Sequence, residues 1–421
     1  MYVRKIFLKD IRGFSELDFD LSRRSPEFAG WFVITGDNAA GKSALLRAIA
    51  MALVGPDATR ALTVSLDGWV REGTTEGEVA VEIKPGDDDR FDRGGRPYKD
   101  AFWSELKFQI VQRATLMEPA NRRRGKQKGP TRGPWSEAAA GWFCAGYGPF
   151  RRLYGHSPEA QRLMSTRGKV ARFATLFRED ATLAESDLWL KELKYRELEK
   201  KEDAGYILEV VLKVLNDGFF PNGITVDRVD SEGLWLKQPD GNSLDLHDMS
   251  DGFRSAAALV MDLLRHLVDI YGVEGLTDDV GAVRHAGVVL IDEIDAHLHP
   301  EWQRVAGGWF KRLFPRIQFI VTTHSPLICQ AADEGGIFHL PAPGTGQKPF
   351  QIADEDYRKI IAGKAESILL SPAFGLEHTR SPTAVESRRE YSRLEAKKRG
   401  IGLTGNEQKK QMELALYVRE D

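Results

Sequence analysis

The chain has 421 residues, of which 42% are hydrophobic and 29% are charged, and its formal net charge is −3. This composition is that of a globular protein and excludes a disordered chain. The length predicts one large domain or two closely packed domains. Because the net charge is small, any nucleic-acid binding must come from a local basic patch. The two cysteines, Cys144 and Cys329, provide neither a disulfide framework nor zinc-site spacing, which favours a reducing, cytoplasmic location.

Membrane insertion is not expected from this sequence. Charged residues interrupt the apolar character of the first 12 residues, so we expect no signal peptide. The longest apolar run, 256–270, contains Asp262, Arg265, His266 and Asp269 and therefore predicts a core helix. The sequence predicts a soluble protein with no membrane partner.

The chain begins with residues that alternate between apolar and polar at 2–8 and again at 17–21, which predicts two strands joined by a turn at 11–14. A short apolar run, 31–35, predicts a third strand. This order predicts an antiparallel flap beside a parallel sheet. Arg12 in the turn either reaches a phosphate or is a solvated turn residue.

A complete G-x-x-x-x-G-K-S motif follows the third predicted strand and precedes a predicted helix, 44–53. Its members are Gly36, Asp37, Asn38, Ala39, Ala40, Gly41, Lys42 and Ser43. Backbone N–H groups and the helix dipole in such a loop cradle the β- and γ-phosphates of a nucleotide. Lys42 is expected to place its charge on those phosphates, and Ser43 is expected to offer its hydroxyl to Mg²⁺. The motif predicts ATP and Mg²⁺ as ligands.

The next part of the chain predicts strands at 79–83 and 106–111, followed by a basic segment at 121–132 with no acidic residue. Its glycines and proline predict a mobile loop. This segment is either a phosphate-backbone contact for DNA or a solvated surface loop. The candidate DNA contacts are Arg122, Arg123, Arg124, Lys126 and Lys128.

The middle of the chain changes from strand to helix patterns. Residues 141–148 predict a buried strand ending in a flexible turn, and 157–215 predict short helices, one of them over 184–202. No sustained heptad is present, which excludes a long coiled-coil arm. Apolar residues at 224–226 and 234–236, with a turn at 239–242, predict a β-hairpin.

A second group of candidate site residues lies in the last third of the chain. The apolar run at 288–291 ends in Asp292 and Glu293, which predicts a central parallel strand with two carboxylates at its ligand-binding edge. Asp292 suits the Mg²⁺ shell, directly or through water. Glu293 suits a general base that orients the attacking water.

The apolar run at 318–323 predicts another buried strand, with His324 at its polar end. A neutral His324 is expected to hydrogen-bond the γ-phosphate or the lytic water.

A helix start lies between the predicted hairpin and the acidic strand. Ser250 is a good N-cap, and Gly252 allows a close backbone approach.

In this order, the phosphate loop, the Ser-x-Gly helix start, the acid pair and the strand-end histidine resemble the head of an ABC-type ATPase of the RecF- and SMC-like branch. The similarity extends to 8–14 and to 292–300, and it covers about 1–60 and 245–340 well. The resemblance implies that Ser250 and Gly252 complete the nucleotide site of a second subunit, so that the protein is a homodimer or a higher even oligomer.

The sequence departs from this family at three places. The usual signature Leu-Ser-Gly-Gly-Gln is replaced by the residues at 249–253, and His299 occupies the place of the aspartate that normally closes the site. The magnesium-contacting glutamine is not evident. Gln109 and Gln112 are candidates, and the turn at 146–148 is an alternative.

The end of the chain predicts a helix over 382–399 with Ser381 as its N-cap, a stop at Gly400 and a second helix starting near Gly405. This helical hairpin is similar to the tail of stand-alone ATPases from Septu and retron-linked antiphage systems. The resemblance implies ATP hydrolysis and control of a separately encoded HNH-type nuclease.

The predicted fold class is α/β: an ABC-type ATPase head with a mostly parallel P-loop sheet and an antiparallel β subdomain, plus a helical insert and a C-terminal helical hairpin. The expected parts are an ATPase lobe at 1–150, the insert and β-hairpin at 151–245, the signature, acidic strand and histidine at 246–345, and the tail at 346–421.

Two other functions stay open. A DNA-repair ATPase of the RecF kind fits the same motifs. A nuclease of the overcoming-lysogenisation (OLD) type would need a metal site after His324, where the only Asp-x-Asp spacing, Asp354 to Asp356, more simply caps a helix beginning at Tyr357.

Overall fold

The computed structural model describes residues 1–23, 28–121, 123, 128–153, 157–166, 168–220, 222–279, 281–415 and 418. Within these residues the chain forms two large β-sheets, a helical insert with a small third sheet, and a C-terminal helical hairpin. The predicted α/β fold class, with a P-loop sheet and a separate antiparallel sheet, is confirmed. None of the described helices combines the length and apolar character that crossing a bilayer requires.

The first sheet is antiparallel and has five strands in the order β2-β1-β4-β5-β6. These strands are β1 (Tyr2–Ile11), β2 (Phe14–Asp20), β4 (Glu76–Lys84), β5 (Phe102–Val111) and β6 (Ala114–Pro119). The first two strands confirm the predicted flap, and β4 and β5 extend the strands expected from the alternating pattern.

The second sheet has six strands in the order β14-β13-β3-β12-β11-β7, and all neighbours are parallel except β13 and β14. Its members are β3 (Gly30–Gly36), β7 (Cys144–Tyr147), β11 (Gly287–Ile291), β12 (Ile317–Thr322), β13 (Ile337–Leu340) and β14 (Phe350–Gln351). The central strands are buried on both faces, as continuous apolar runs require.

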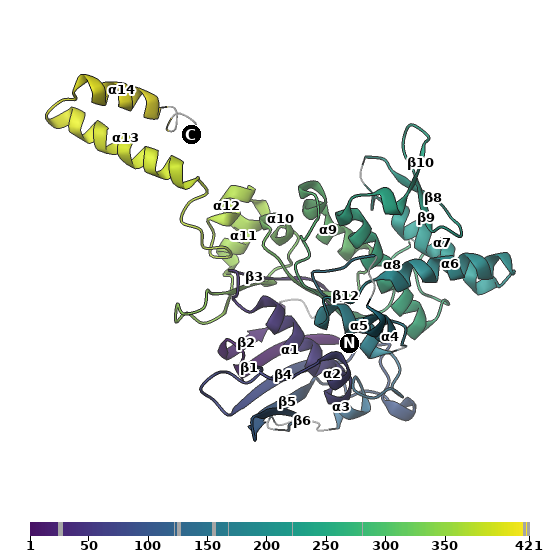
Figure 1. The fold of residues 1–421 in the computed structure, drawn as a ribbon. Coiled ribbons are helices and arrows are strands. Elements are labelled where there is room, and N and C mark those ends of the chain that lie inside the picture. Colours follow the sequence, from purple (N-terminus) through teal and green to yellow (C-terminus); the bar gives the residue numbers. More distant parts are fainter. Residues whose placement is uncertain are drawn as a thin grey trace.

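Helix α1 (Lys42–Val54) lies between the two sheets, where it contacts β4 and β5 on one side and β3 and β11 on the other (Figure 1). Helix α9 (Pro300–Leu313) covers the opposite face of the six-stranded sheet. There Phe310 stacks on Trp31, with ring centroids 5.8 Å apart.

The first sheet is bordered by short helical elements, which are α2 (Pro56–Leu62), α3 (Gly129–Arg132) and a 3₁₀ turn (Asp92–Gly94). Because α3 falls inside the predicted loop at 121–132, that prediction is wrong at this end.

The described part of the insert contains four helices and a three-stranded sheet. The helices are α4 (Pro158–Met164), α5 (Lys169–Phe177), α6 (Ala184–Leu198) and α7 (Glu202–Asn216). The strands are β8 (Thr225–Val229), β9 (Leu234–Lys237) and β10 (Ser243–Asp245). Two predictions need correction here. The helix expected over 184–202 ends at Leu198, and the turn at 239–242 joins β9 to a third strand instead of closing a simple hairpin.

Helix α8 (Asp251–Tyr271) follows a 3₁₀ turn (Leu246–Asp248) and packs against the insert. After β12 come α10 (Pro326–Cys329), α11 (Asp354–Ala362) and α12 (Ala365–Leu369). Helix α11 begins at Asp354, three residues before the predicted Tyr357, so the acidic residues occupy its first turn instead of preceding it.

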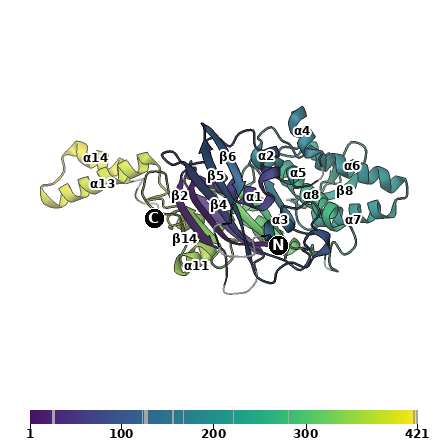
Figure 2. The same ribbon diagram turned by 90° about the horizontal axis from the view of Figure 1, so that it is seen from below.

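The C-terminal hairpin consists of α13 (Pro382–Gly400) and α14 (Gly405–Leu414). Ser381 caps α13 as predicted, by accepting a hydrogen bond from Ala384 N. The hairpin stands away from the rest of the molecule, at the end opposite to α6 and α7 (Figure 1; Figure 2). Among the described residues of these two helices, only Leu394 and Gln411 are buried.

Candidate functional site

The phosphate loop connects β3 to α1, as the sequence predicts. Gly36 (φ 148°) and Gly41 (φ 95°) have backbone conformations that other residues rarely adopt. A Cβ at Gly36 would lie 2.5 Å from the carbonyl oxygen of Leu340, and one at Gly41 would lie 2.7 Å from Cζ of Phe14. Asp37, Asn38, Ala39 and Ala40 form the turn between the two glycines, and Ala39 is itself in the left-handed region (φ 64°). The loop is therefore fixed by contacts with β13 and β2.

Lys42 begins α1 and is almost fully buried. Its ammonium donates hydrogen bonds to the carbonyl oxygens of Gly36 (2.8 Å) and Asp37 (2.9 Å). Burial lowers the pKa of Lys42, whereas the nearby carboxylates of Glu293 and Asp292 act to raise it. The ammonium of Lys42 is thus hydrogen-bonded by carbonyl groups of the phosphate loop, and the charges of the acid pair act to raise its pKa.

The acid pair follows β11, and the parallel pairing of β3, β12 and β11 brings their carboxyl ends to one edge of the sheet. Asp292 is fully buried. Its Oδ1 accepts a hydrogen bond from Thr322 Oγ1 at 2.5 Å, and its Oδ2 has no hydrogen-bond partner among the described residues. A buried carboxylate oxygen without a partner suits a divalent cation, because Mg²⁺ prefers oxygen ligands. Ser43 lies half-buried in the first turn of α1.

Glu293 has a left-handed backbone (φ 45°), which is unusual for a residue other than glycine. Its N–H donates to Thr322 Oγ1 at 2.7 Å, and its side chain is half-buried. Strained backbones of this kind cluster at functional sites.

Arg151 is a residue of this site that the sequence analysis did not single out. Its fully buried guanidinium donates to the carbonyl oxygens of Gly148 (2.8 Å), Asp292 (2.7 Å) and Glu293 (3.0 Å). Burial lowers the pKa of Arg151 to about 10, against the opposing effect of the Asp292 carboxylate, so the group stays charged at neutral pH. The only signal in the sequence is a basic residue shortly after a buried strand, which does not reveal its partner.

His324 follows β12 at the same edge of the sheet, and its side chain is exposed. The backbone N–H of His324 donates a hydrogen bond to Asp295 Oδ1 at 3.3 Å, and Thr323 Oγ1 donates to the same carboxylate oxygen. Asp295 thereby connects the carboxyl end of β12 to the segment that follows the acid pair through hydrogen bonds.

Ser250 and Gly252 lie at the N-terminus of α8. Ser250 is the N-cap residue, but its exposed hydroxyl makes no capping hydrogen bond within the described residues. A Cβ at Gly252 would overlap the carbonyl oxygen of His297. The close approach expected at Gly252 is therefore made within the chain, to the segment after β11.

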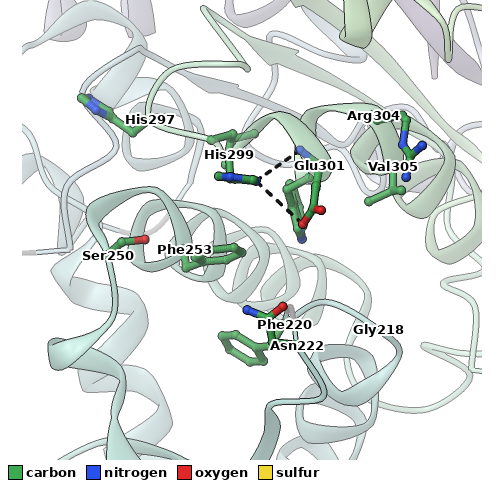
Figure 3. Close-up of a pocket in the computed structure, with 12 residues that line it drawn as sticks. Gly218, Phe220, Asn222, Ser250, Phe253, His297, His299, Glu301, Arg304 and Val305 are labelled. Carbon is green, nitrogen blue, oxygen red and sulfur yellow. Dashed lines mark hydrogen bonds and ion pairs between the residues drawn. The ribbon is translucent and has the colours of Figure 1, made fainter.

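A pocket of about 670 Å³ lies beside Ser250. In Figure 3, Ser250 lies at the N-terminus of α8 and Phe253 in its first turn, while His299 lies opposite Phe253 on the segment before α9. His299 is the N-cap of α9, and its Nδ1 accepts a hydrogen bond from Glu301 N at 3.3 Å.

The candidates for a magnesium-contacting group lie in different places. Gln109 is on β5, where its Nε2 donates to Glu76 Oε1 at 2.6 Å, and Gln112 is in the turn to β6. Gly146 and Tyr147 are on β7, so the turn expected at 146–148 is a strand up to Tyr147. Asp292 N donates to the Tyr147 carbonyl oxygen at 2.8 Å. Of the three candidates, the end of β7 is the one placed beside the acid pair.

Arg12 lies in the turn between β1 and β2, where its guanidinium is 4.8 Å from the ring centroid of Trp69. Burial lowers the pKa of Arg12, and the charge of Arg47 on α1 lowers it further. Phe14 of the same flap contacts the phosphate loop at Gly41. The flap therefore lies against the loop, and a phosphate contact by Arg12 stays a prediction.

The basic segment is described only in part, and Arg122, Arg124 and Lys126 lie outside the described residues. Arg123 forms an ion pair with Glu78, and its guanidinium lies 4.1 Å from the ring centroid of Phe7. This ion pair joins Arg123 to the five-stranded sheet, and the assignment of Arg123 as a DNA contact stays a prediction. Lys128 is exposed at the start of α3.

Two family models match separate parts of the chain. One, described as an AAA domain, matches residues 5–128. The other, described as "AAA domain, putative AbiEii toxin, Type IV TA system", matches residues 168–330.

Two curated relatives are also similar to this chain. A Septu protein PtuA from Bacillus mycoides (strain KBAB4) is 23% identical over 388 residues, which cover 90% of this chain and 45% of the relative. A retron Ec83 probable ATPase from Escherichia coli is 34% identical over 178 residues, which cover 38% of this chain and 31% of the relative. The chain resembles the ABC-type ATPases of antiphage defence. The predicted resemblance is confirmed, and the chain aligns with less than half the length of each of these two relatives.

Solved structures of SMC heads are also similar to this chain. The Smc head bound to the C-terminal winged-helix domain of ScpA has a TM-score of 0.49 and 17% identity, and the match covers 85% of this chain and all of that one. A Pyrococcus furiosus Smc head with an extended coiled coil has a TM-score of 0.48, also with 17% identity, over 86% of this chain and 98% of that one.

Proposed function

We propose that this protein binds and hydrolyses ATP with Mg²⁺ at the edge where the phosphate loop meets the acid pair. The observation that carries the proposal is the buried, unpartnered Oδ2 of Asp292, at the sheet edge whose carboxylates also act on Lys42. Burying a carboxylate oxygen away from water and without a hydrogen-bond donor costs free energy, unless a cation binds to it.

The residues divide into three roles in this proposal. The loop N–H groups and Lys42 hold the phosphates, and Ser43 and Asp292 hold Mg²⁺. Glu293 accepts a proton from the attacking water, and His324 binds the γ-phosphate from the neighbouring strand. Arg151 keeps Glu293 in place through the main-chain carbonyl groups of the acid pair.

We further propose that two heads close around ATP. The exposed Ser250 hydroxyl and the adjoining pocket support this proposal, because a second head that covered them would complete the site. A single head leaves the γ-phosphate open on one side, so two bound nucleotides would stabilise the dimer and hydrolysis would release it.

ATP hydrolysis measured across a dilution series tests the dimer. Specific activity is expected to rise steeply with protein concentration, and Lys42→Ala is expected to abolish nucleotide binding. A flat specific activity would contradict dimerisation alone, whereas wild-type binding by the Lys42→Ala protein would contradict the assigned site.

The biological role we propose is control of a DNA-directed nuclease of the HNH type in the cytoplasm, as part of antiphage defence. The similarity to the Septu and retron proteins supports this role. Co-purification with the product of the neighbouring gene, with and without ATP, tests it. A replication protein in place of a nuclease would favour DNA repair instead.

A further inference from the structure

A second polar cavity, of about 360 Å³, lies near the amino end of β7. Gly141 and Trp142, which precede β7, form one wall; the first turn of α5 and the last turns of α8 form the others. The phosphate loop follows the carboxyl end of β3, and β3 runs parallel to β7 within the sheet. The cavity is therefore separate from the proposed ATP site.

Arg172 is the unusual residue of this cavity. Its side chain is 7% exposed, and its Nε is buried without a hydrogen-bond partner. Within the described residues no hydrogen bond or ion pair reaches the guanidinium, which lies 6.0 Å from the ring centroid of Phe143. A buried cation without an anion is strongly unfavourable. Within the described part of the chain, the guanidinium of Arg172 has no anionic partner in direct contact with it.

Other donors converge on the same space. Lys169 is 6% exposed, and its Nζ donates to the Ser136 carbonyl oxygen at 2.9 Å. Gly168 caps α5 without a side-chain hydrogen bond, which leaves first-turn N–H groups available. Burial lowers the pKa of Lys169 against the opposing charge of Glu137, and the charge of Arg172 lowers it further.

Two acidic residues also line the cavity, and among the described residues neither forms an ion pair with Arg172. Glu137 lies 3.4 Å from Lys169, and Asp269 lies on α8; both are exposed. Buried His266 lines the cavity and is paired with Asp262, with Nε2 3.2 Å from Oδ2. None of these carboxylates is joined to Arg172 by a hydrogen bond or an ion pair among the described residues.

We propose that the cavity formed by Lys169, Arg172, His266 and the first turn of α5 binds the phosphate group of a small phosphate monoester. A guanidinium fork matches two phosphate oxygens, and the N-terminus of a helix adds N–H donors to the others. The volume is in the range of small-molecule sites, and Trp142 and Ile270 supply an apolar wall.

Binding to the Lys42→Ala protein tests this proposal, because that change removes the phosphate loop as a competing site. Inorganic phosphate and adenosine 5′-monophosphate are titrated separately by calorimetry at constant ionic strength. We expect saturable binding that Arg172→Gln weakens by about tenfold or more. Arg162→Gln, which removes an equal charge from an exposed position on α4, is the matched control and should bind like its parent.

The two probes distinguish the source of the phosphate. Equal affinities would assign the site to the phosphate group alone, and tighter binding of the nucleotide would assign it to a nucleoside monophosphate. Arg172→Lys, which keeps the charge but removes the fork, covers the case in which the glutamine variant does not fold, and it should also weaken binding. The proposal is overturned if neither probe binds or if the folded Arg172 variants bind as tightly as the parent.

Discussion

The α-carbon of Gly252 lies against the carbonyl oxygen of His297, so closely that a Cβ at this position would overlap that oxygen. This contact joins the N-terminus of α8, which carries Ser250, to the segment that follows the acid pair. The glycine is explained by this packing within the chain, without reference to a second subunit.

Replacing Gly252 by alanine is expected to push the first turn of α8 away from His297. We expect a loss of about 1–3 kcal/mol in unfolding free energy, as for other overpacked sites, and reduced ATP turnover. Gly308→Ala is the matched control, because Gly308 has open space around it on α9 and alanine there should stabilise the helix by up to about 1 kcal/mol. Chemical denaturation and hydrolysis assays measure both effects, and unchanged stability of Gly252→Ala would contradict the packing.

Glu293→Gln tests the proposed base. The change keeps the shape of the side chain, so ATP binding is expected to stay as in the parent while turnover falls by about 10²- to 10⁴-fold. Nucleotide binding and single-turnover hydrolysis separate the two steps. Glu355→Gln, at an exposed position on α11, is the control and should have no effect. Normal turnover by the Glu293→Gln protein would remove Glu293 from the mechanism.

Arg151 is expected to act as a positioning residue. Replacing it by methionine removes three hydrogen bonds to carbonyl groups, which should lower the unfolding free energy by about 3 kcal/mol. Because Glu293 then loses its support, kcat should fall more than KM rises. Arg152→Met, at the exposed neighbouring residue, is the control. Equal effects of the two changes would show that the buried contacts do not orient Glu293.

The C-terminal hairpin should respond to acid. Hydrogen bonds from Lys397 and from the backbone and side chain of Thr404 lower the pKa of Glu407 to about 2. A carboxylate with a lowered pKa stabilises the fold above its ordinary pKa, and this contribution is lost as the pH falls from about 4.3 towards 2.

Hydrogen exchange of α14 measured between pH 5 and pH 3 tests this expectation. Protection of α14 should decrease over this interval in the parent, and Glu407→Gln should remove the contribution of this carboxyl group to the pH dependence. An identical pH profile for the two proteins would contradict the assigned role of Glu407.

The elements around the proposed ATP site could be predicted because their signals are short and local. Glycines at fixed spacing, an apolar run ending in Asp292, and a serine before a helix each specify a few adjacent residues. The strand before the phosphate loop, the acidic strand and the helix after Ser250 are all confirmed. The roles assigned to Lys42, Glu293 and His324 stay predictions that the experiments above test.

The features that were missed depend on partners far away in the sequence. Arg151 reaches a carbonyl group 141 residues later, and no local pattern specifies such a contact. The strand at β10 has only three residues, too few to show alternation, so its pairing with β9 was not evident. The place of β7 beside β11 follows from parallel pairing across the insert, which a single sequence does not reveal.

Helix α8 is a single rod of 21 residues, about 31 Å long. Its first turn borders the pocket beside Ser250, and its last turns, with His266 and Asp269, border the cavity of Arg172. Because α8 is one continuous helix, a shift of its first turn would also move or bend its last turns. Any shift of α8 caused by a second subunit closing over Ser250 would therefore also move the residues that border the cavity of Arg172 at the other end of the helix.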